Sequence, residues 1–360
     1  MALGTRLRCR PSPWPHPHPP DLLGSCLGRN VPDFPKPDSL FSSTLPFQCQ
    51  HLHPDPSGTT PLVAVKKGTF SEDRWIARWT KPFLRRKTTG IRYSIGHDCA
   101  VLHALSSQTD LVLKTDTVVE GVHFTASTSP VLIGRKALAR PLSDLAAAGA
   151  VPKAALITVG CHGLTQALRL EKAYQGLARL AEKFNLHVVG GETVRTRQLF
   201  LSVSLMGAVA RGRSPGRSGG KAGDHLFVTG KLGGSWPRRH LTFDPRLAEG
   251  QWLVRHRFAS AMVDLSDGLG ADLPRMARAS HVGFQIEPEK LPLAPKATHR
   301  SAFTQGEDYE LLFSVPPRQV ALLQKKWPFS TRITEIGRLL PKGRGFHTGG
   351  LPLRGYDHFR

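Results

Sequence analysis

The chain contains the stretch Asp264-Leu265-Ser266-Asp267-Gly268-Leu269, which follows directly on the largely apolar run Ala259–Val263. A short apolar run of this kind predicts a buried strand, and Asp267-Gly268 is typical of a turn. A carboxylate at the end of a buried strand is costly unless a cation or hydrogen-bond donors accompany it. The stretch therefore predicts a strand, a turn that carries two carboxylates and a hydroxyl, and a helix that begins at Leu269.

Acidic residues recur beside small residues elsewhere in the chain. The chain is poor in acid, with 27 Asp and Glu residues against 49 Lys and Arg residues, so the repeated pattern indicates a function. Carboxylates at strand ends, with glycines that let the backbone approach a ligand, suit Mg²⁺ that carries a polyphosphate. The other acidic stretches are Gly96-His97-Asp98, Thr115-Asp116-Thr117, Ser143-Asp144, Gly190-Gly191-Glu192 and Gly306-Glu307-Asp308.

Each acidic residue also has a plainer interpretation. Asp98 after a glycine is typical of a turn, and the threonines on either side of Asp116 are typical of an ordinary strand. Asp144 lies in the Ala-rich stretch Ala137–Ala150, so it is either a helix-surface residue or the ligand of a bound group. We predict that Gly190-Gly191 is a turn whose N–H groups meet a phosphate. The sequence contains no P-loop and no protein-kinase signature, so an ATP site must have another design.

Length and composition favour a globular enzyme. The 360 residues can form two ordinary domains, and no window approaches 18 consecutive apolar residues, which disfavours a transmembrane span. The net charge of +22 suits either nucleic-acid binding or the attraction of anionic phosphate substrates. The basic residues are scattered and no nucleic-acid-binding signature is present, so we expect no nucleic-acid partner.

Five cysteines form neither a C-x-x-C pair nor an even framework. This pattern indicates a reduced, cytoplasmic compartment. We expect Cys99 and Cys161 to lie in the core as small apolar residues.

Residues 1–68 differ from the rest of the chain, because they hold 13 of its 29 prolines. We predict disorder there, with a targeting peptide and a start assigned too far upstream as alternatives, and we expect activity to survive removal of the segment. Phe70–Trp79 is predicted as a short helix. Arg211–Gly220, with four glycines and a proline, is the predicted boundary between the domains 69–212 and 213–360.

Strands and helices alternate in both halves, which predicts two α/β or α+β domains and hints at a duplicated architecture. The predicted strands are Leu111–Val119, Ala154–Val159, Leu199–Ala210, His225–Thr229, Ala259–Leu265, Gly283–Ile286, Tyr309–Val315 and Ile333–Leu339. The predicted helices are Val131–Gly149, Ala167–Phe184, Leu269–Ala279 and Arg318–Trp327.

Read in order, the acidic stretches closely resemble the thiamine-monophosphate kinase family, whose superfamily includes aminoimidazole ribonucleotide synthetase and selenophosphate synthetase. The resemblance runs from about Phe70 to the C-terminus, and Val119-Glu120-Gly121-Val122-His123-Phe124 distinguishes this family from its superfamily relatives. The other matching segments are Ile95–Leu102, Thr115–Val118, Lys136–Ala150, Val189–Thr193, Asp264–Leu269, Gly306–Leu311 and Gly355–Phe359.

The resemblance implies a two-domain fold like that of aminoimidazole ribonucleotide synthetase, with an N-terminal dimerising β-sheet domain and a C-terminal α/β domain. It implies transfer of the γ-phosphoryl group of ATP to thiamine monophosphate by direct in-line attack, with several Mg²⁺ ions and no catalytic base. It also implies a homodimer in the cytoplasm. The alternatives are a selenophosphate synthetase-like enzyme, which needs a reactive cysteine, and a non-catalytic basic binding protein.

Site residues follow from the same resemblance. The implied metal ligands are Asp98, Thr115, Asp116, Asp144, Glu192, Asp264 and Asp267. The implied ATP contacts are Gly191, Glu192, Arg217, Ser266 and Tyr174, and the implied substrate contacts are His123, Glu307, Leu353 and Tyr356. Four residues depart from the family pattern: His97 stands where the family usually has the first of two aspartates, Lys114 replaces a residue that is often Ser, Glu192 replaces Asp, and Leu353 replaces the aromatic residue expected to cover the thiamine ring, for which Tyr356 is the alternative.

Overall fold

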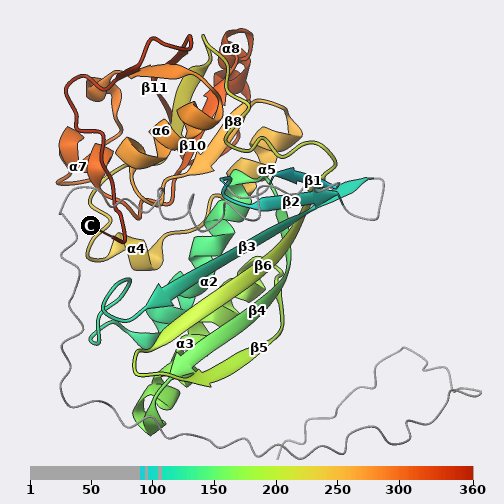
Figure 1. Cartoon of the computed structure of the whole chain (residues 1–360), viewed down its shortest axis with the longest axis vertical. Helices are drawn as coiled ribbons and strands as arrows, with labels where there is room; N and C mark the ends of the chain where they lie inside the picture. Colours follow the sequence, from blue (N-terminus) through green and yellow to red (C-terminus); the bar gives the residue numbers. More distant parts are fainter. Residues whose placement is uncertain (1–89, 94–95, 104–107, 360) are drawn as a thin grey trace, which may run out of the picture. The chain divides into compact units, whose positions relative to one another are not determined.

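The computed structural model describes residues 90–93, 96–103 and 108–359 (Figure 1). The predictions for residues 1–68 and for a helix over Phe70–Trp79 lie outside the described residues. Within the described part of the chain, no helix combines the length and apolar character that crossing a bilayer requires.

Six strands form the first sheet of the described chain, in the order β1-β2-β3-β6-β4-β5. Neighbouring strands are antiparallel, except β4 and β5, which are parallel. The long strands β3 and β6 pair from Thr109 opposite Ala210 to Val119 opposite Phe200. The bounds are β1 Ile91–Tyr93, β2 Ala100–His103, β3 Thr109–Val119, β4 Val151–Cys161, β5 His187–Arg195 and β6 Phe200–Ala210.

The second described sheet has the order β12-β9-β11-β7-β10-β8, and only the pair β12 and β9 is parallel. Strands β8 and β10 are neighbours, with Asp264 opposite Leu311. The acidic stretches that follow β8 and precede β10 therefore meet at one edge of this sheet. The bounds are β7 His225–Thr229, β8 Ala261–Asp264, β9 Gly283–Ile286, β10 Leu311–Val315, β11 Ile333–Leu340 and β12 Phe346–His347.

Helix α2, Pro130–Ala147, contacts strands of both sheets. It packs with α3 against the first sheet, and its other contacts include β8, α4 and α5 (Figure 1). Both sheets belong to one unit of the fold, Val65–Arg360. The remaining helices are α3 Gly163–Lys183, α4 Arg239–Thr242, α5 Leu247–Arg255, α6 Leu269–Ala279, the 3₁₀ helix η1 Pro288–Lys290, α7 His299–Thr304 and α8 Pro317–Lys326.

Side-chain alternation explains the different surroundings of the two sheets. On β6, Leu201, Val203 and Leu205 are buried, whereas Ser204 and Met206 on the opposite face are exposed. The first sheet therefore buries one face against helices. Strands β8 and β10 are buried at every residue, as expected for a sheet covered on both sides.

The mixed α/β class predicted from the sequence is confirmed, and the predicted helix Leu269–Ala279 matches α6. The predicted turn at Gly190-Gly191 is wrong, because both glycines lie inside strand β5. A Cβ on Gly191 would lie 1.9 Å from the carbonyl oxygen of Ile157. Glycine is needed there so that β5 can approach β4 closely.

Candidate active site

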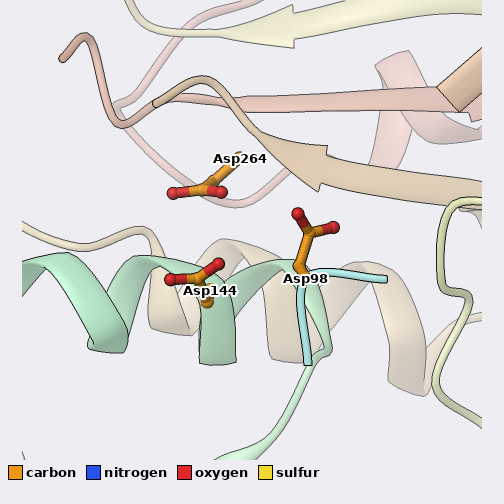
Figure 2. A group of neighbouring side chains, drawn as sticks. All are labelled: Asp98, Asp144 and Asp264. Atoms are coloured by element: carbon orange, nitrogen blue, oxygen red, sulfur yellow. The ribbon is translucent and has the colours of Figure 1, made fainter. Parts of the chain in front are cut away.

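Three carboxylates from separate parts of the chain point toward one another (Figure 2). Asp98 precedes β2, Asp144 lies on α2, and Asp264 ends β8. One ligand atom from each carboxylate lies within 4.8 Å of the others. Among the described residues, Oδ2 of Asp264 is buried without a hydrogen-bond partner. An orphaned carboxylate oxygen beside two further carboxylates fits a divalent cation such as Mg²⁺, which prefers oxygen ligands.

Burial opposes the negative charge of this cluster. Burial and, second, the charge of Asp98 raise the pKa of Asp264 to about 7. Burial also raises the pKa of Asp144 above its ordinary value. These carboxylates are ionised together only when positive charge is close to them.

Part of that positive charge comes from α2 and β3. Lys136, Arg140 and Asp144 follow one another at four-residue spacing, so they share one face of α2. Lys114 and Asp116 are two residues apart on β3, so they share the face of that strand. Lys114 Nζ lies 2.8 Å from Asp144 Oδ1, and Arg140 Nη2 lies 3.2 Å from Asp116 Oδ1.

Two further arginines pair with acids of the same region. Arg217 donates through Nε to Asp98 Oδ1 at 3.0 Å, and Arg275 forms an ion pair with Asp267. Asp264 forms no ion pair within the described residues. It is therefore the carboxylate of this region that most needs an external cation.

These side chains line an open cavity of about 280 Å³, which we call the acidic cavity. Its walls come from both halves of the chain, because β3 and α2 contribute on one side and β8 and α6 on the other. It is lined by Asp98, Lys114, Asp116, Arg140, Asp144, Arg217, Asp264, Ser266, Asp267, Arg275, Tyr309 and His358.

A second cavity of about 70 Å³, which we call the aromatic cavity, adjoins the first. It is lined by Val122, His123, Arg140, Trp236, Ser266, Asp267, Gly306, Glu307, Tyr309, Tyr356 and His358. The two cavities share Arg140, Ser266, Asp267, Tyr309 and His358. A polar, acidic space and an aromatic space therefore meet at the Ser266-Asp267 turn.

Glu307 faces the aromatic cavity from a backbone with φ of 64°, which is uncommon for a residue other than glycine. Its carboxylate lies 2.6 Å from Lys136 Nζ and 3.0 Å from His240 Nδ1. Burial opposes the charge, but the hydrogen bond with His240 and the charge of Lys136 lower the pKa of Glu307 to about 2. Burial lowers the pKa of Lys136 to about 8, although Glu307 opposes this. Glu307 is thus ionised and held at a fixed position.

His123 and Trp236 both line the aromatic cavity, and their surroundings differ. His123 Nδ1 accepts a hydrogen bond from the Val119 N–H at 3.1 Å, and burial and Arg140 lower the pKa of His123 to about 3, so this ring is neutral. Trp236 stacks on His240 with a centroid distance of 3.8 Å, yet 47% of its surface is exposed. One face of the indole is therefore held while the side chain remains accessible to a ligand.

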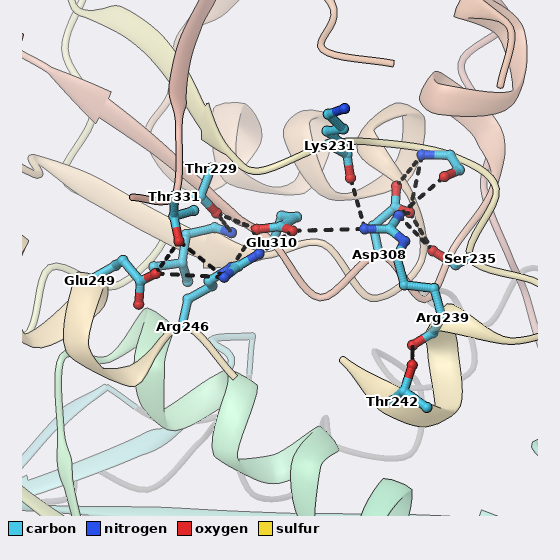
Figure 3. A network of polar contacts seen from close by, with 12 residues as sticks. Thr229, Lys231, Ser235, Arg239, Thr242, Arg246, Glu249, Asp308, Glu310 and Thr331 are labelled. Atoms are coloured by element: carbon cyan, nitrogen blue, oxygen red, sulfur yellow. Dashed lines mark hydrogen bonds and ion pairs between the residues drawn. The ribbon is translucent and has the colours of Figure 1, made fainter. Parts of the chain in front are cut away.

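A buried network beside Glu307 holds the loop in place (Figure 3). Asp308 accepts hydrogen bonds from the Gly233 N–H at 2.9 Å and from Ser235 Oγ at 2.5 Å, and it pairs with Arg239 at 2.5 Å. Burial raises the pKa of Asp308 to about 6, although Ser235 and Gly233 oppose the shift. These bonds fix the backbone that follows Glu307.

The same network continues to Glu310, which is also buried (Figure 3). Arg246 donates to it through Nε and Nη2 at 2.7 Å each, and Thr229 Oγ1 donates at 2.7 Å. Tyr309 between the two buried acids has φ of 50°. Strained backbone of this kind persists only where the surrounding structure fixes it, and Asp308 and Glu310 provide that support.

Most of the predicted site residues line one of the two cavities. Those at the acidic cavity are Asp98, Asp116, Asp144, Arg217, Asp264, Ser266 and Asp267, and those at the aromatic cavity are His123, Glu307 and Tyr356.

The structure places the other predicted residues elsewhere. Thr115 Oγ1 bonds Ser204 Oγ at 3.1 Å, on the face of β3 opposite Lys114 and Asp116. Gly191 and Glu192 lie exposed on β5, where the Thr193 N–H donates to the Glu192 carboxylate at 2.7 Å. Tyr174 lies on α3 and lines neither cavity, and Leu353 lines a separate one with Arg278 and Pro274.

Several residues at the cavities were missed from the sequence. Arg140 could have been found, because it lies four residues after Lys136 and four before Asp144 on a predicted helix. Lys114 lies two residues before Asp116 on a predicted strand, so the two side chains point to the same face. It could have been found in the same way. Trp236 lies in an irregular stretch, where the local sequence gives no signal of its neighbours.

The comparison with protein families finds one match in the N-terminal half. The family model "AIR synthase related protein, N-terminal domain" matches residues 96–209.

Curated relatives match most of the chain. The thiamine-monophosphate kinase of Escherichia coli (strain K12) is 34% identical over 316 residues, which cover 77% of this chain and 94% of that protein. The thiamine-monophosphate kinase of Aquifex aeolicus is 33% identical over 299 residues, which cover 74% and 92%.

Solved structures agree. The structure described as AaThiL complexed with AMPPCP and TMP has 32% identity and a TM-score of 0.69, and the match covers 80% of this chain and 97% of that one. The thiamine-monophosphate kinase of Stenotrophomonas maltophilia K279a has 31% identity and a TM-score of 0.62, with 79% and 97% covered.

Proposed function

The chain belongs to the thiamine-monophosphate kinase family, and we infer that it is an enzyme that transfers a phosphoryl group from ATP to thiamine monophosphate, giving thiamine diphosphate. The observation that carries this inference for the chain itself is the meeting of two unlike cavities at Ser266-Asp267. The acidic cavity suits a nucleoside triphosphate with its bound cations. The aromatic cavity suits a small molecule that has rings and a phosphate.

We propose that Asp98, Asp144 and Asp264 hold Mg²⁺, with Asp116 and Asp267 as further ligands. The support is the orphaned Oδ2 of Asp264 and the short separation of the three carboxylates. Bound there, Mg²⁺ would neutralise the β- and γ-phosphate oxygens of ATP.

The chain itself contributes position and charge. Arg140, Arg217 and Lys114 line the acidic cavity and can approach phosphate oxygens, and Ser266 Oγ can donate a hydrogen bond where the two substrates meet. A substrate phosphate oxygen is already a nucleophile, so in-line transfer requires no general base and no covalent intermediate.

We propose that the thiamine ring lies in the aromatic cavity, between Trp236 and the side chains of Tyr356 and His358. The ionised Glu307 complements a cationic or amino-bearing ring. The neutral His123, whose Nδ1 accepts from Val119, can donate a hydrogen bond to the substrate through Nε2. Trp236 then serves as the aromatic cover that Leu353 does not provide.

We further propose a homodimer that forms through the face of the first sheet that no described helix covers. Thr115 lies on that face and Glu192 on its edge strand, so these residues and Gly191 can reach a nucleotide site only in a second copy of the chain. A cytoplasmic location is part of the same proposal, because ATP is the phosphoryl donor and Cys99 and Cys161 are free thiols.

The alternative of a selenophosphate synthetase-like enzyme needs a reactive cysteine. Of the two described cysteines, Cys99 directly follows Asp98 of the acidic cluster, but burial raises the pKa of its thiol well above the ordinary value. A buried, protonated thiol is a poor nucleophile. The structure therefore gives no support to that alternative among the described cysteines.

The test is a direct assay of the purified protein with ATP, Mg²⁺ and thiamine monophosphate, with chromatographic detection of thiamine diphosphate. We expect product with the wild-type protein and a loss of at least 100-fold with Asp264→Ala/Asp267→Ala, because metal-assisted charge neutralisation supplies several kcal/mol. Glu287→Gln, which removes an ion pair with Lys290 outside both cavities, is the matched control. Absence of product, or full activity in the double variant, would contradict the proposal.

A further inference from the structure

Lys114 occupies an unusual place within the acidic cavity. Its Nζ lies 2.8 Å from Asp144 Oδ1, and Asp144 supplies one of the three ligand atoms that lie within 4.8 Å of one another. The Lys114 side chain is 22% exposed and the Asp144 side chain 7%, so their contact is partly shielded from water. An ammonium group therefore already lies at the carboxylate cluster.

The other basic groups of the cavity differ from Lys114 in chemistry. Arg140, Arg217 and Arg275 present broad planar guanidinium groups, each paired with an acid outside the pair Asp144 and Asp264. A lysine ammonium is a compact point charge, which resembles a metal ion more closely than a guanidinium does. Of these groups in the described chain, Lys114 is the one paired with Asp144.

The balance of charges in the acidic cavity is consistent with the Lys114 ammonium group standing in for one metal ion. Asp98, Asp116, Asp144 and Asp267 each have a basic partner, and Asp264 has no ion-pair partner within the described residues. The carboxylates thus need less external positive charge than their number suggests. Oδ2 of Asp264 remains the open ligand for a divalent ion.

We propose that the Lys114 ammonium takes the place of one divalent cation, so that this chain binds one Mg²⁺ fewer with its nucleotide than the same carboxylates would bind without Lys114. The proposal rests on the metal-dependent kinase function proposed above. It predicts that one more metal ion is bound when the ammonium is removed, because Asp144 Oδ1, which contacts Lys114, becomes free to ligate a further ion.

The first test counts metal ions rather than turnover. Mn²⁺ bound to the purified chain is measured by equilibrium dialysis with saturating AMPPCP, for the wild-type protein, Lys114→Met and Lys114→Arg. We expect Lys114→Met to bind one Mn²⁺ more per chain than the wild type, and Lys114→Arg, which keeps the charge, to match the wild type. An equal count in Lys114→Met and wild type would overturn the proposal.

The second test measures thermal unfolding with and without Mg²⁺. Without metal, Lys114→Met leaves Asp144 buried and unpaired, so we expect its melting temperature to fall by several degrees. With saturating Mg²⁺ and AMPPCP, the difference from the wild type should close. A deficit that metal does not reduce, including failure to fold in Mg²⁺, would show that a divalent ion cannot replace Lys114 and would overturn the proposal.

These measurements separate the inference from the proposed function. If Lys114→Met gains an ion but the wild type forms no thiamine diphosphate, the kinase proposal fails and the role of Lys114 stands. If the wild type is active and the ion counts are equal, the kinase proposal stands and the role of Lys114 fails.

Discussion

Trp236 and His240 form a stacked pair at the wall of the aromatic cavity, with one half of the tryptophan left open. If a ring of the substrate lies against this indole, Trp236→Ala should raise the KM for thiamine monophosphate about fivefold, since an aromatic contact contributes about 1 kcal/mol. The KM for ATP should stay unchanged. Trp236→Phe keeps an aromatic face and should stay within about threefold of the wild type in steady-state kinetics. Equal increases in both KM values would contradict this placement of the ring.

The pair of Glu307 and Lys136 predicts a defined dependence of stability on pH. The pKa of Glu307 falls from an ordinary 4.5 to about 2 in the folded protein. Its ionised form therefore stabilises the fold fully above pH 4.5, and this contribution is lost as the pH falls toward 2. We expect Glu307→Gln to lower the free energy of unfolding by about 3 kcal/mol at pH 7, because Lys136 is left buried without its partner.

Urea unfolding at several pH values between 7 and 3 checks that prediction. The difference between wild type and Glu307→Gln should shrink below pH 4.5, since the wild-type advantage depends on an ionised carboxylate. Glu287→Gln, at an exposed ion pair with Lys290, should change the free energy of unfolding by less than about 1 kcal/mol. A difference that is constant across this pH range would mean that the charge of Glu307 is not its source.

Some residue placements follow from the sequence and others do not. Asp264 could be placed at a strand end because an apolar run precedes it, and Asp144 could be placed on a buried helix face. Thr115 and Asp116 are adjacent on β3, so they point to opposite faces, and only one of them can face Asp144. That consequence was available from the strand prediction. The contact of Lys136 with Glu307, 171 positions later, was not available, because nothing local indicates it.

At the scale of elements, α2 and α3 touch through a pair of glycines. A Cβ on Gly134 of α2 would lie 1.8 Å from the Ala173 carbonyl oxygen, and a Cβ on Gly176 of α3 would lie 1.9 Å from the Val131 carbonyl oxygen. Each glycine thus permits the other helix to approach its backbone. The same approach positions α2, whose polar face lines the acidic cavity.

Gly176→Ala should therefore destabilise the protein although alanine favours helix formation. Intrinsic propensity favours the change by about 1 kcal/mol, and overpacking against backbone costs about 1–3 kcal/mol or more, so we expect a net loss. The measurement is the midpoint of urea unfolding, with Gln175→Ala as the control, because Gln175 is the exposed neighbour on the same helix. An unchanged or raised midpoint in Gly176→Ala would contradict the close contact of the two helices.

Gly190 and Gly191 show why element prediction was incomplete. A glycine pair is typical of a turn, and the same pair also allows two strands to approach closely. The choice between them depends on β4, whose Ile157 lies opposite Gly191. By contrast, α6 was predicted with its bounds, because its apolar periodicity and the preceding Asp267-Gly268 are local signals.

For the whole molecule, the site depends on both halves of the chain. Asp98 and Asp144 come from the half that contains the first sheet, and Asp264 from the half that contains the second. Helix α2 supports this arrangement because it packs against β3 and also contacts β8. Neither half alone contains the three-carboxylate cluster, so a gene fragment that encodes one half should lack the site.

The last prediction concerns the face of the first sheet that is left open within the described part of the chain. Leu113, Leu156 and Met206 are exposed by 40%, 51% and 37%, and strand register places Leu113 opposite Met206. Leu156 lies on the same face, because it is opposite Ser204 of β6, two residues before Met206. Adjacent apolar side chains on such a sheet face are typical of a protein interface, and a second copy of this chain is the partner proposed above.

Leu156→Lys should convert the proposed dimer to a monomer, since the interface would bury an unpaired charge from each copy. Sedimentation equilibrium at a fixed protein concentration should give twice the chain mass for the wild type and the single-chain mass for the variant. Leu322→Lys on α8, where the leucine is 45% exposed, adds the same charge at a different surface and should leave the mass unchanged. Because Glu192 lies on the edge strand of this sheet, the monomeric variant should also lose phosphoryl transfer if a second copy completes the site. A wild-type monomer would contradict the dimer, and an active monomeric variant would restrict the site to the residues of one chain.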